Sequence, residues 1–185
     1  MLMTTAGYAE TRGDWLTGLT GNGTARWTEE GGTLIYRGGA TFGWAVLPKT
    51  SVRDGFVQVR FKPVAGRQDQ AGGVVWRWRD ANNYYVARGN ALEDNVVAYK
   101  VADGRRTDLK PVGASAQAYG IKARVASEAF HTLRVDFSGS EFSVTFDGQR
   151  LFRVEDPTFR EPGAVGVWSK ADSVTEFDTF EYGGK

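Results

Sequence analysis

Polar side chains that can bind a ligand gather around one turn in the middle of the chain. Arg88 is followed closely by Asn90, Glu93 and Asn95. Arginine presents several donors in one plane, whereas asparagine and glutamate supply acceptors, so that such a group can bind hydroxyl or carboxylate groups. The same side chains could instead close the turn through hydrogen bonds to one another. The segment therefore predicts a ligand site and leaves a purely structural role open.

Basic and aromatic residues on the neighbouring segments extend this candidate site. Strict alternation over residues 74–79 places the two tryptophans on the core face, so that Arg77 points the other way and can share a face with Arg88. Flat aromatic rings pack against the apolar face of a pyranose, although a β-sandwich also needs such rings in its core. The predicted ligand-binding residues are Arg77, Arg88, Asn90, Glu93, Asn95, Lys100, Tyr85 and Trp168.

Metal and cofactor chemistry has little support in the sequence. The chain has no cysteine and a single histidine, His131, which excludes thiolate sites, cysteine nucleophiles and multi-histidine metal sites. Asp147, Asp172 and Asp178 could contribute to a calcium site on loops, but the sequence has no compact run of oxygen ligands. We therefore predict no cofactor and keep calcium as the alternative.

Size and charge limit the kinds of partner. We expect one domain over residues 1–185, in which residues 1–30 are the least certain part. The formal net charge of +1 and the scattered basic residues do not favour nucleic acid or an anionic membrane. No apolar run approaches the roughly 18–20 residues of a membrane helix, and no signal peptide is visible.

Three consecutive strands must position the polar turn. They are predicted over Gly73–Arg79, Tyr84–Arg88 and Asn95–Val101, separated by turns rich in Asn, Asp and Gly. A further hairpin is predicted at Asp103-Gly104 because both residues tolerate positive φ angles. The long Ala- and Gly-rich stretch Pro111–Arg124 is a candidate flap over a site.

Short aromatic and β-branched segments fill the rest of the chain. No segment of ten or more residues has the 3.6-residue period of a helix, so helix should be almost absent. Many short strands with frequent turns predict an all-β protein, an antiparallel two-sheet sandwich or a barrel. Trp15 and Trp27 are expected to anchor the N-terminal segment.

Several motifs together resemble one bacterial family. They include residues 72–79 with the following Asp80-Ala-Asn-Asn-Tyr-Tyr85, Arg88–Asn95, His131–Val135 and Gly166–Val174. The chain is similar to the concanavalin A-like, laminin-G-like jelly rolls that are often labelled family 16 glycoside hydrolase-like or 3-keto-disaccharide hydrolase domains. The resemblance implies a jelly roll whose concave face binds carbohydrate, in an exported protein that is periplasmic or extracellular.

The C-terminal segment carries the strongest catalytic pattern. Glu176, Asp178 and Glu181 spell E-x-D-x-x-E, the signature in which family 16 glycosidases carry a nucleophile and an acid/base. Phe177 and Phe180 can both face inward only if a bulge lies near residues 178–179, which would turn the three acids outward together. The motif lies at the end of the chain, whereas those enzymes carry it in the middle, so we assign no catalytic residue.

The sequence therefore predicts a β-sandwich that acts as a carbohydrate-binding, lectin-like module. A glycoside hydrolase-like enzyme and a noncatalytic structural or protein-interaction domain remain the alternatives. The predicted partner is a saccharide or glycan, without nucleic acid and without a membrane span.

Overall fold

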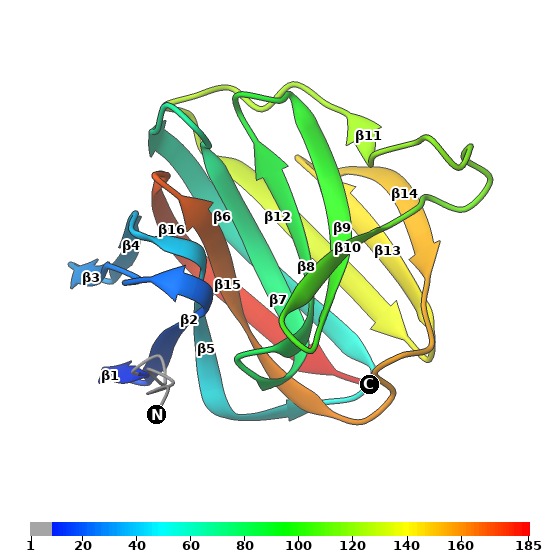
Figure 1. The fold of residues 1–185 in the computed structure, drawn as a ribbon. Coiled ribbons are helices and arrows are strands. Elements are labelled where there is room, and N and C mark those ends of the chain that lie inside the picture. The colour runs from blue at the N-terminus through cyan, green and yellow to red at the C-terminus, as the bar shows by residue number, and fades with distance from the viewer. Residues whose placement is uncertain (1–8) are drawn as a thin grey trace, which may run out of the picture.

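Two antiparallel sheets make up the computed structural model, which describes residues 9–185 (Figure 1). The first sheet runs, in spatial order, β1 (Glu10–Arg12), β2 (Trp15–Gly23), β5 (Ala40–Val52), β15 (Gly163–Ala171), β7 (Ala71–Asp80), β8 (Asn83–Asn90), β9 (Asn95–Ala102) and β10 (Arg105–Leu109), with β11 (Ile121–Lys122) also paired to β9. The second runs β14 (Gln149–Glu155), β13 (Glu141–Phe146), β12 (His131–Ser138), β6 (Gly55–Ala65), β16 (Val174–Gly184), β4 (Thr33–Arg37) and β3 (Trp27–Glu30).

The predicted all-β class is confirmed. Residues 9–185 contain strands and turns and no helix, and hence no helix that could cross a membrane. The three predicted central strands are β7, β8 and β9. Asp103 and Gly104, with φ angles of 49° and 77°, form the turn of the predicted hairpin between β9 and β10. The predicted domain range also includes residues 1–8, which lie outside the described residues.

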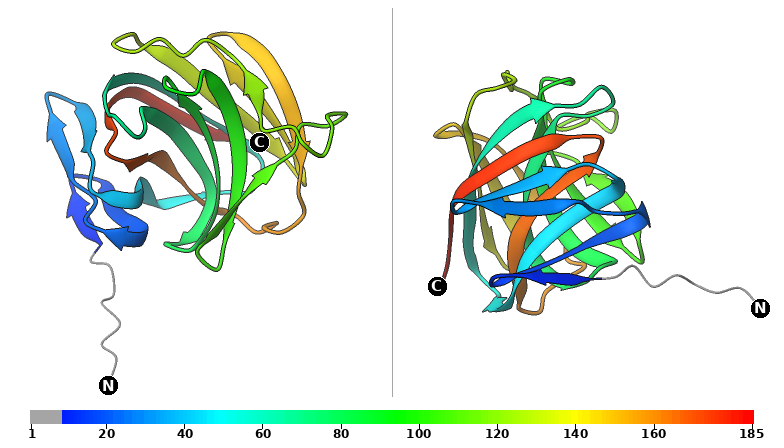
Figure 2. Two further views of the ribbon diagram at one scale, coloured as in Figure 1. Left: turned by 45° about the horizontal axis from the view of Figure 1, so that its top comes forward. Right: turned by 90° about the vertical axis from the view of Figure 1, so that its left-hand side faces the viewer.

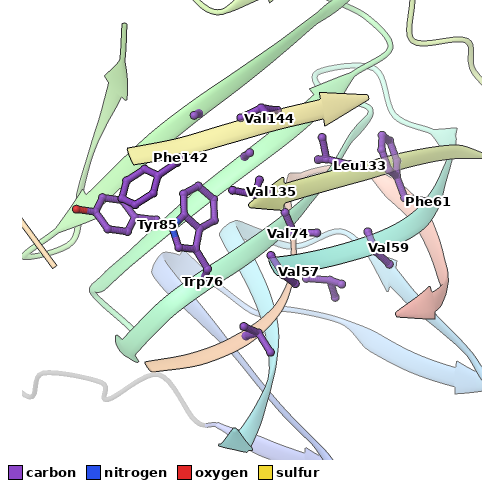
Figure 3. Packing of buried hydrophobic residues seen from close by; sticks show 14 of the residues in the cluster. Val57, Val59, Phe61, Val74, Trp76, Tyr85, Leu133, Val135, Phe142 and Val144 are labelled. Carbon is purple, nitrogen blue, oxygen red and sulfur yellow. The ribbon is translucent and has the colours of Figure 1, made fainter. Parts of the chain in front are cut away.

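Apolar side chains of both sheets interdigitate to form the main core. Val57, Val59 and Phe61 alternate along β6 and meet Val74 and Trp76 of β7 (Figure 3). The Trp76 ring lies 5.4 Å from the Tyr85 ring and 5.3 Å from the Phe142 ring. These residues are fully buried, and burial of such rings supplies much of the free energy that holds the sheets together.

The outer face of the first sheet is also apolar at its centre. Trp44, Tyr84 and Trp168 lie there, buried, together with several valines. The sheet curls around them, because the guanidinium of Arg106 on β10 lies 4.9 Å from the Phe42 ring on β5. In a flat sheet these strands would be about 24 Å apart. We call this curled face the trough; its floor is Trp44, Tyr84 and Trp168.

A β-bulge in β7 overturns one prediction. Arg77 adopts a left-handed φ of 48°, and the pairing with β8 shifts register between Trp76 and Asp80. Trp76 and Arg77 therefore both point between the sheets, and Trp78 turns to the trough, where its ring lies 5.0 Å from Trp44. The predicted common face for Arg77 and Arg88 is wrong because strict alternation fails at the bulge.

The bulge predicted in the last strand is confirmed. Thr179 has a φ of 47°, and the register of β16 against β6 shifts between Asp178 and Glu181. Phe177 is buried in the core, and Phe180 packs 5.1 Å from Trp15. Trp27 is buried beside Tyr36 and Phe177, so that both predicted N-terminal anchors are in place. Strands β1 to β4 lie on the side opposite to β13 and β14 (Figure 2, left).

Candidate functional site

The structure divides the eight predicted ligand residues into two groups. Five lie on the trough face, four of them in one cluster at its end and one in the floor: Arg88, Asn90, Glu93, Asn95 and Trp168. The other three face the space between the sheets: Arg77, Tyr85 and Lys100. The cluster lies near the turn between β8 and β9, at the top of Figure 1, and Glu93 is its exposed member.

Arg77 serves the fold instead of a ligand. Its guanidinium donates to the carbonyl oxygens of Arg53 at 2.9 Å and Phe159 at 2.8 Å and pairs with Asp54 at 3.3 Å. The side chain is 0% exposed, and burial lowers the pKa of Arg77 even though Asp54 opposes that effect. Arg77 therefore ties two loops to the end of the sandwich.

Tyr85 and Lys100 hold the segment that follows β14. The Tyr85 hydroxyl donates to the Asp156 carboxylate at 2.6 Å, and Lys100 Nζ lies 3.2 Å from the same carboxylate. Desolvation would raise the pKa of Asp156, but hydrogen bonds from Tyr85, Thr158 and Lys100 outweigh it and the pKa is lowered. Because Tyr85 is fully buried, a ligand on the surface cannot reach it.

Arg88 is the centre of the cluster at the end of the trough. Its guanidinium donates to Glu93 at 2.7 Å and to the Tyr99 hydroxyl at 2.9 Å, and it also bonds the Asn95 side chain. The side chain is only 1% exposed. Arg88 thus cannot move freely, and it fixes the position of the half-exposed Glu93 carboxylate.

A second buried chain of hydrogen bonds lies beside the first. Asn90 donates to Asp69 at 2.8 Å, and Asp69 pairs with Lys170 of β15 at 3.1 Å. The Asn90 side-chain oxygen also accepts from the backbone N–H groups of Gln70 and Leu92. Asn90 and Asp69 are buried, whereas the Lys170 side chain reaches the surface.

Glu93 and Lys170 are close enough to influence one another. Desolvation alone would raise the pKa of Glu93, but the positive charges of Arg88 and, further away, Lys170 lower it. The site therefore presents a carboxylate held by Arg88 and an ammonium group held by Asp69. This pair can accept from one hydroxyl and donate to another.

Aromatic rings border the two charged groups. Phe42 is the direct cross-strand partner of Lys170. The Arg106 guanidinium lies over the Phe42 ring and is also 4.3 Å from the centre of the Tyr99 ring. Tyr119, on the predicted flap, bonds through its hydroxyl to Tyr99 and Arg88 and leaves its ring exposed. We call the set Glu93, Lys170, Phe42, Arg106 and Tyr119 the trough mouth.

Sequence reasoning found Arg88, Asn90, Glu93 and Asn95 but missed much of the trough mouth. Asp69, Lys170, Phe42 and Arg106 come from distant strands and loops, and no local pattern in the sequence joins them to the turn. Trp168 lies in the floor with its ring 5.3 Å from Phe42 and is fully buried, so it supports the site from below.

The E-x-D-x-x-E motif is on the other sheet and does not form a pair of acids. Glu176 bonds Lys62 at 2.9 Å, and Asp178 is held by two bonds from Arg60 at 2.8 and 3.0 Å. Glu176 and Glu181 pair with residues 62 and 58 of β6, which separates their backbones by about 13 Å at 3.3 Å per residue. Retaining glycosidases need carboxyl groups about 5–5.5 Å apart.

The three aspartates considered for calcium are engaged separately. Asp147 bonds His131 at 2.8 Å, Asp178 bonds Arg60, and Asp172 accepts from the backbone N–H groups of residues 67, 68 and 69. In the part of the chain that the structure describes, no three His, Asp or Glu residues are grouped to hold a metal.

Several solved structures have a fold similar to that of this chain. The carbohydrate-binding module CBM66 from Bacillus subtilis has a TM-score of 0.74 and 20% identity, with 91% of this chain and 94% of that chain covered. LamA from Z. galactanivorans, solved in complex with laminaritriose and laminaritetraose, has a TM-score of 0.62 and 11% identity, with 96% and 95% covered. A Bacillus subtilis protein of unknown function with a galectin-like fold has a TM-score of 0.61 and 11% identity, with 91% and 88% covered.

These similarities establish the fold. The chain is a jelly roll of the type that the sequence motifs implied. No protein-family model matches the chain, and no curated protein matches it.

Proposed function

We propose that this protein is a noncatalytic, lectin-like module that binds carbohydrate at the trough mouth. The observation that carries the proposal is an exposed carboxylate, Glu93, and a partly exposed ammonium, Lys170, each held by a buried hydrogen-bond chain and bordered by the rings of Tyr119 and Phe42. Function thus attaches to the end of the trough, because its centre is filled by the protein's own side chains.

The chemistry of the trough mouth suits a sugar. A pyranose or furanose presents neighbouring hydroxyls, each of which donates and accepts, and the trough mouth offers an acceptor in Glu93 and several donors in Lys170. The rings of Phe42 and Tyr119 can cover the apolar C–H face. Since Arg88 and Asp69 hold the charged groups in place, little conformational entropy is lost when a ligand binds.

The structural neighbours support the same class of ligand. One is named as a carbohydrate-binding module, and another was solved in complex with laminaritriose and laminaritetraose. Other neighbours are described as glycosyl hydrolases, but the acidic motif of this chain does not favour that role, because Glu176 and Asp178 are each ion-paired on the outer face of the second sheet.

A glycan array of neutral and acidic saccharides tests the proposal, followed by calorimetry on the best ligands. We expect binding by the wild type, and a loss of at least about tenfold in Glu93→Gln and in Lys170→Met, since a hydrogen bond to a charged group contributes about 1.5–3 kcal/mol. The matched controls are Glu176→Gln and Lys62→Met, which change another Lys–Glu pair on the second sheet. Equal losses in both pairs, or no saccharide bound, would refute the proposal.

A further inference from the structure

A surface cleft of about 690 Å³ adjoins the trough mouth. It shares Phe42 and Lys170 with the mouth, and it is otherwise lined by small and polar residues. The residues that bear side-chain functional groups are Asn22, Arg26, Arg37, Thr41, Gln68 and Asp172. A ligand that enters the mouth can therefore extend into the cleft without crossing a wall of side chains.

Three of the four charged side chains that line the cleft have a partner. Arg37 pairs with Glu30 at 2.8 Å, and Lys170 pairs with Asp69 at 3.1 Å. The carboxylate of Asp172 accepts three backbone N–H groups and is not within salt-bridge distance of an arginine. Within residues 9–185, the side chain of Arg26 has neither a salt bridge nor a hydrogen bond. Arg26 is thus the charged side chain of the cleft that has no hydrogen-bond partner among the described residues, although its formal charge is offset by that of Asp172.

The local backbone holds Arg26 in place. Its N–H donates to the Gly38 carbonyl at 3.1 Å, and its own carbonyl accepts from Arg37 N–H at 2.7 Å. A Cβ atom at Gly39 would lie 2.7 Å from Arg26 Nη1, so the guanidinium lies directly against the Gly39 backbone. Gly39 has a φ of 105°, a conformation that glycine adopts readily, and the missing side chain leaves the space that the guanidinium uses.

We propose that the cleft binds an anionic group, a carboxylate or a sulfate ester, on the sugar unit next to the one held in the trough mouth. This inference rests on the proposed function and names its ligand class: an acidic oligosaccharide. Arg26 supplies the charge, because the planar guanidinium matches the paired oxygens of a carboxylate or sulfate. Asn22, Thr41 and Gln68 can bond the hydroxyls of the same unit.

Matched pairs of ligands that differ only in charge test the inference. Calorimetry compares trigalacturonate with its methyl ester, and a κ-carrageenan tetrasaccharide with its desulfated form, on the wild type, Arg26→Gln and Arg105→Gln. Arg105 is exposed on β10 and lines neither the mouth nor the cleft. The first pair probes a carboxylate source and the second a sulfate source.

In the wild type, at least one acidic ligand should bind about tenfold more tightly than its uncharged form. Arg26→Gln should abolish that difference while changing the affinity for the uncharged form less than about twofold, and Arg105→Gln should behave as the wild type. The preference should also weaken at high salt, because the contact is open to solvent.

Equal binding of charged and uncharged ligands by the wild type, or a preference that survives in Arg26→Gln, overturns the inference. If neutral saccharides still bind and Glu93→Gln still loses them, the proposed function stands without it. Absence of all saccharide binding overturns both. Thermal unfolding of Arg26→Gln should match the wild type, since exposed substitutions of this kind leave the Tm nearly unchanged.

Discussion

Replacing Arg77 by methionine separates a structural from a ligand-binding role for this residue. Methionine keeps most of the apolar stem and removes the guanidinium. The carbonyl oxygens of Phe159 and Arg53 then lose their donors, and Asp54 loses its cationic partner. The expected result is a large loss of stability with no loss of saccharide binding, because Arg77 lies between the sheets and away from the trough mouth.

The size of the effect follows from these contacts. Each hydrogen bond from a charged donor contributes about 1.5–3 kcal/mol, and an unsatisfied buried carbonyl costs about 1–3 kcal/mol. Removing a buried charge also relieves its desolvation, which offsets part of the loss. The net destabilisation should be about 2–4 kcal/mol, or roughly 5–15 °C in Tm for a domain of this size.

Urea unfolding followed by tryptophan fluorescence measures this change. Arg79→Met is the matched control, because Arg79 is exposed two residues further along the same strand and its guanidinium lies over the Phe159 ring, 5.7 Å from the ring centroid. The control should lose about 1 kcal/mol or less. An Arg77→Met variant as stable as the control, or one that loses saccharide affinity at unchanged stability, would refute the structural role.

Three further predictions follow from single contacts. Gly72→Ala should lose about 1–3 kcal/mol in urea unfolding, because the new Cβ would lie 2.4 Å from the Phe61 ring, whereas Gly184→Ala, with its nearest atom at 3.9 Å, should not. Asp156→Asn should flatten the dependence of the unfolding free energy on acidic pH. The pKa of Asp156 is lower in the folded protein than the value of about 3.9 in the unfolded chain, so the ionised carboxylate stabilises the fold above that pH. This contribution is lost as the pH falls through the folded pKa. Glu176→Gln should cost about 0.2–1 kcal/mol and leave saccharide affinity unchanged, since its pair with Lys62 is a surface salt bridge.

Each of these predictions has a clear contrary result. A Gly72→Ala variant with wild-type stability would mean that the core adjusts around the extra methyl group. If Asp156→Asn lost stability as steeply as the wild type when the pH falls below about 4, other carboxylates would account for the acid sensitivity. A drop in saccharide binding by Glu176→Gln would return the C-terminal motif to consideration as part of a site.

The sequence determines much of the fold because hydrophobic alternation and turn residues act locally. The central strands, the Asp103-Gly104 hairpin and the bulge at Thr179 follow from such local patterns. The bulge at Arg77 does not, because a valine- and tryptophan-rich strand shows no excess residue in its own pattern. Its register depends on how β7 meets β8 and β15, which is a property of the whole sheet.

In the candidate site, too, the residues that are close together in the sequence could be predicted and the distant ones could not. The local turn from Arg88 to Asn95 was recognisable because its polar residues lie close together in the chain. Asp69, by contrast, meets Asn90 across about 20 residues of sequence and Lys170 across about 100. Tyr85 and Lys100 carry the same chemical groups as site residues, but they point between the sheets toward Asp156. Side-chain direction, set by strand register, decided which polar residues reach the surface.

NMR chemical-shift mapping tests the central claim most directly. An isotope-labelled sample is titrated with the tightest saccharide from the array, and the backbone amide signals are followed with the indole N–H of Trp168. We expect the largest shifts at Glu93, Lys170 and Gln68 and a smaller one at Trp168, with the amides of Arg60, Lys62 and Glu176 unchanged. Shifts concentrated on the second sheet, with the trough mouth unaffected, would contradict the account.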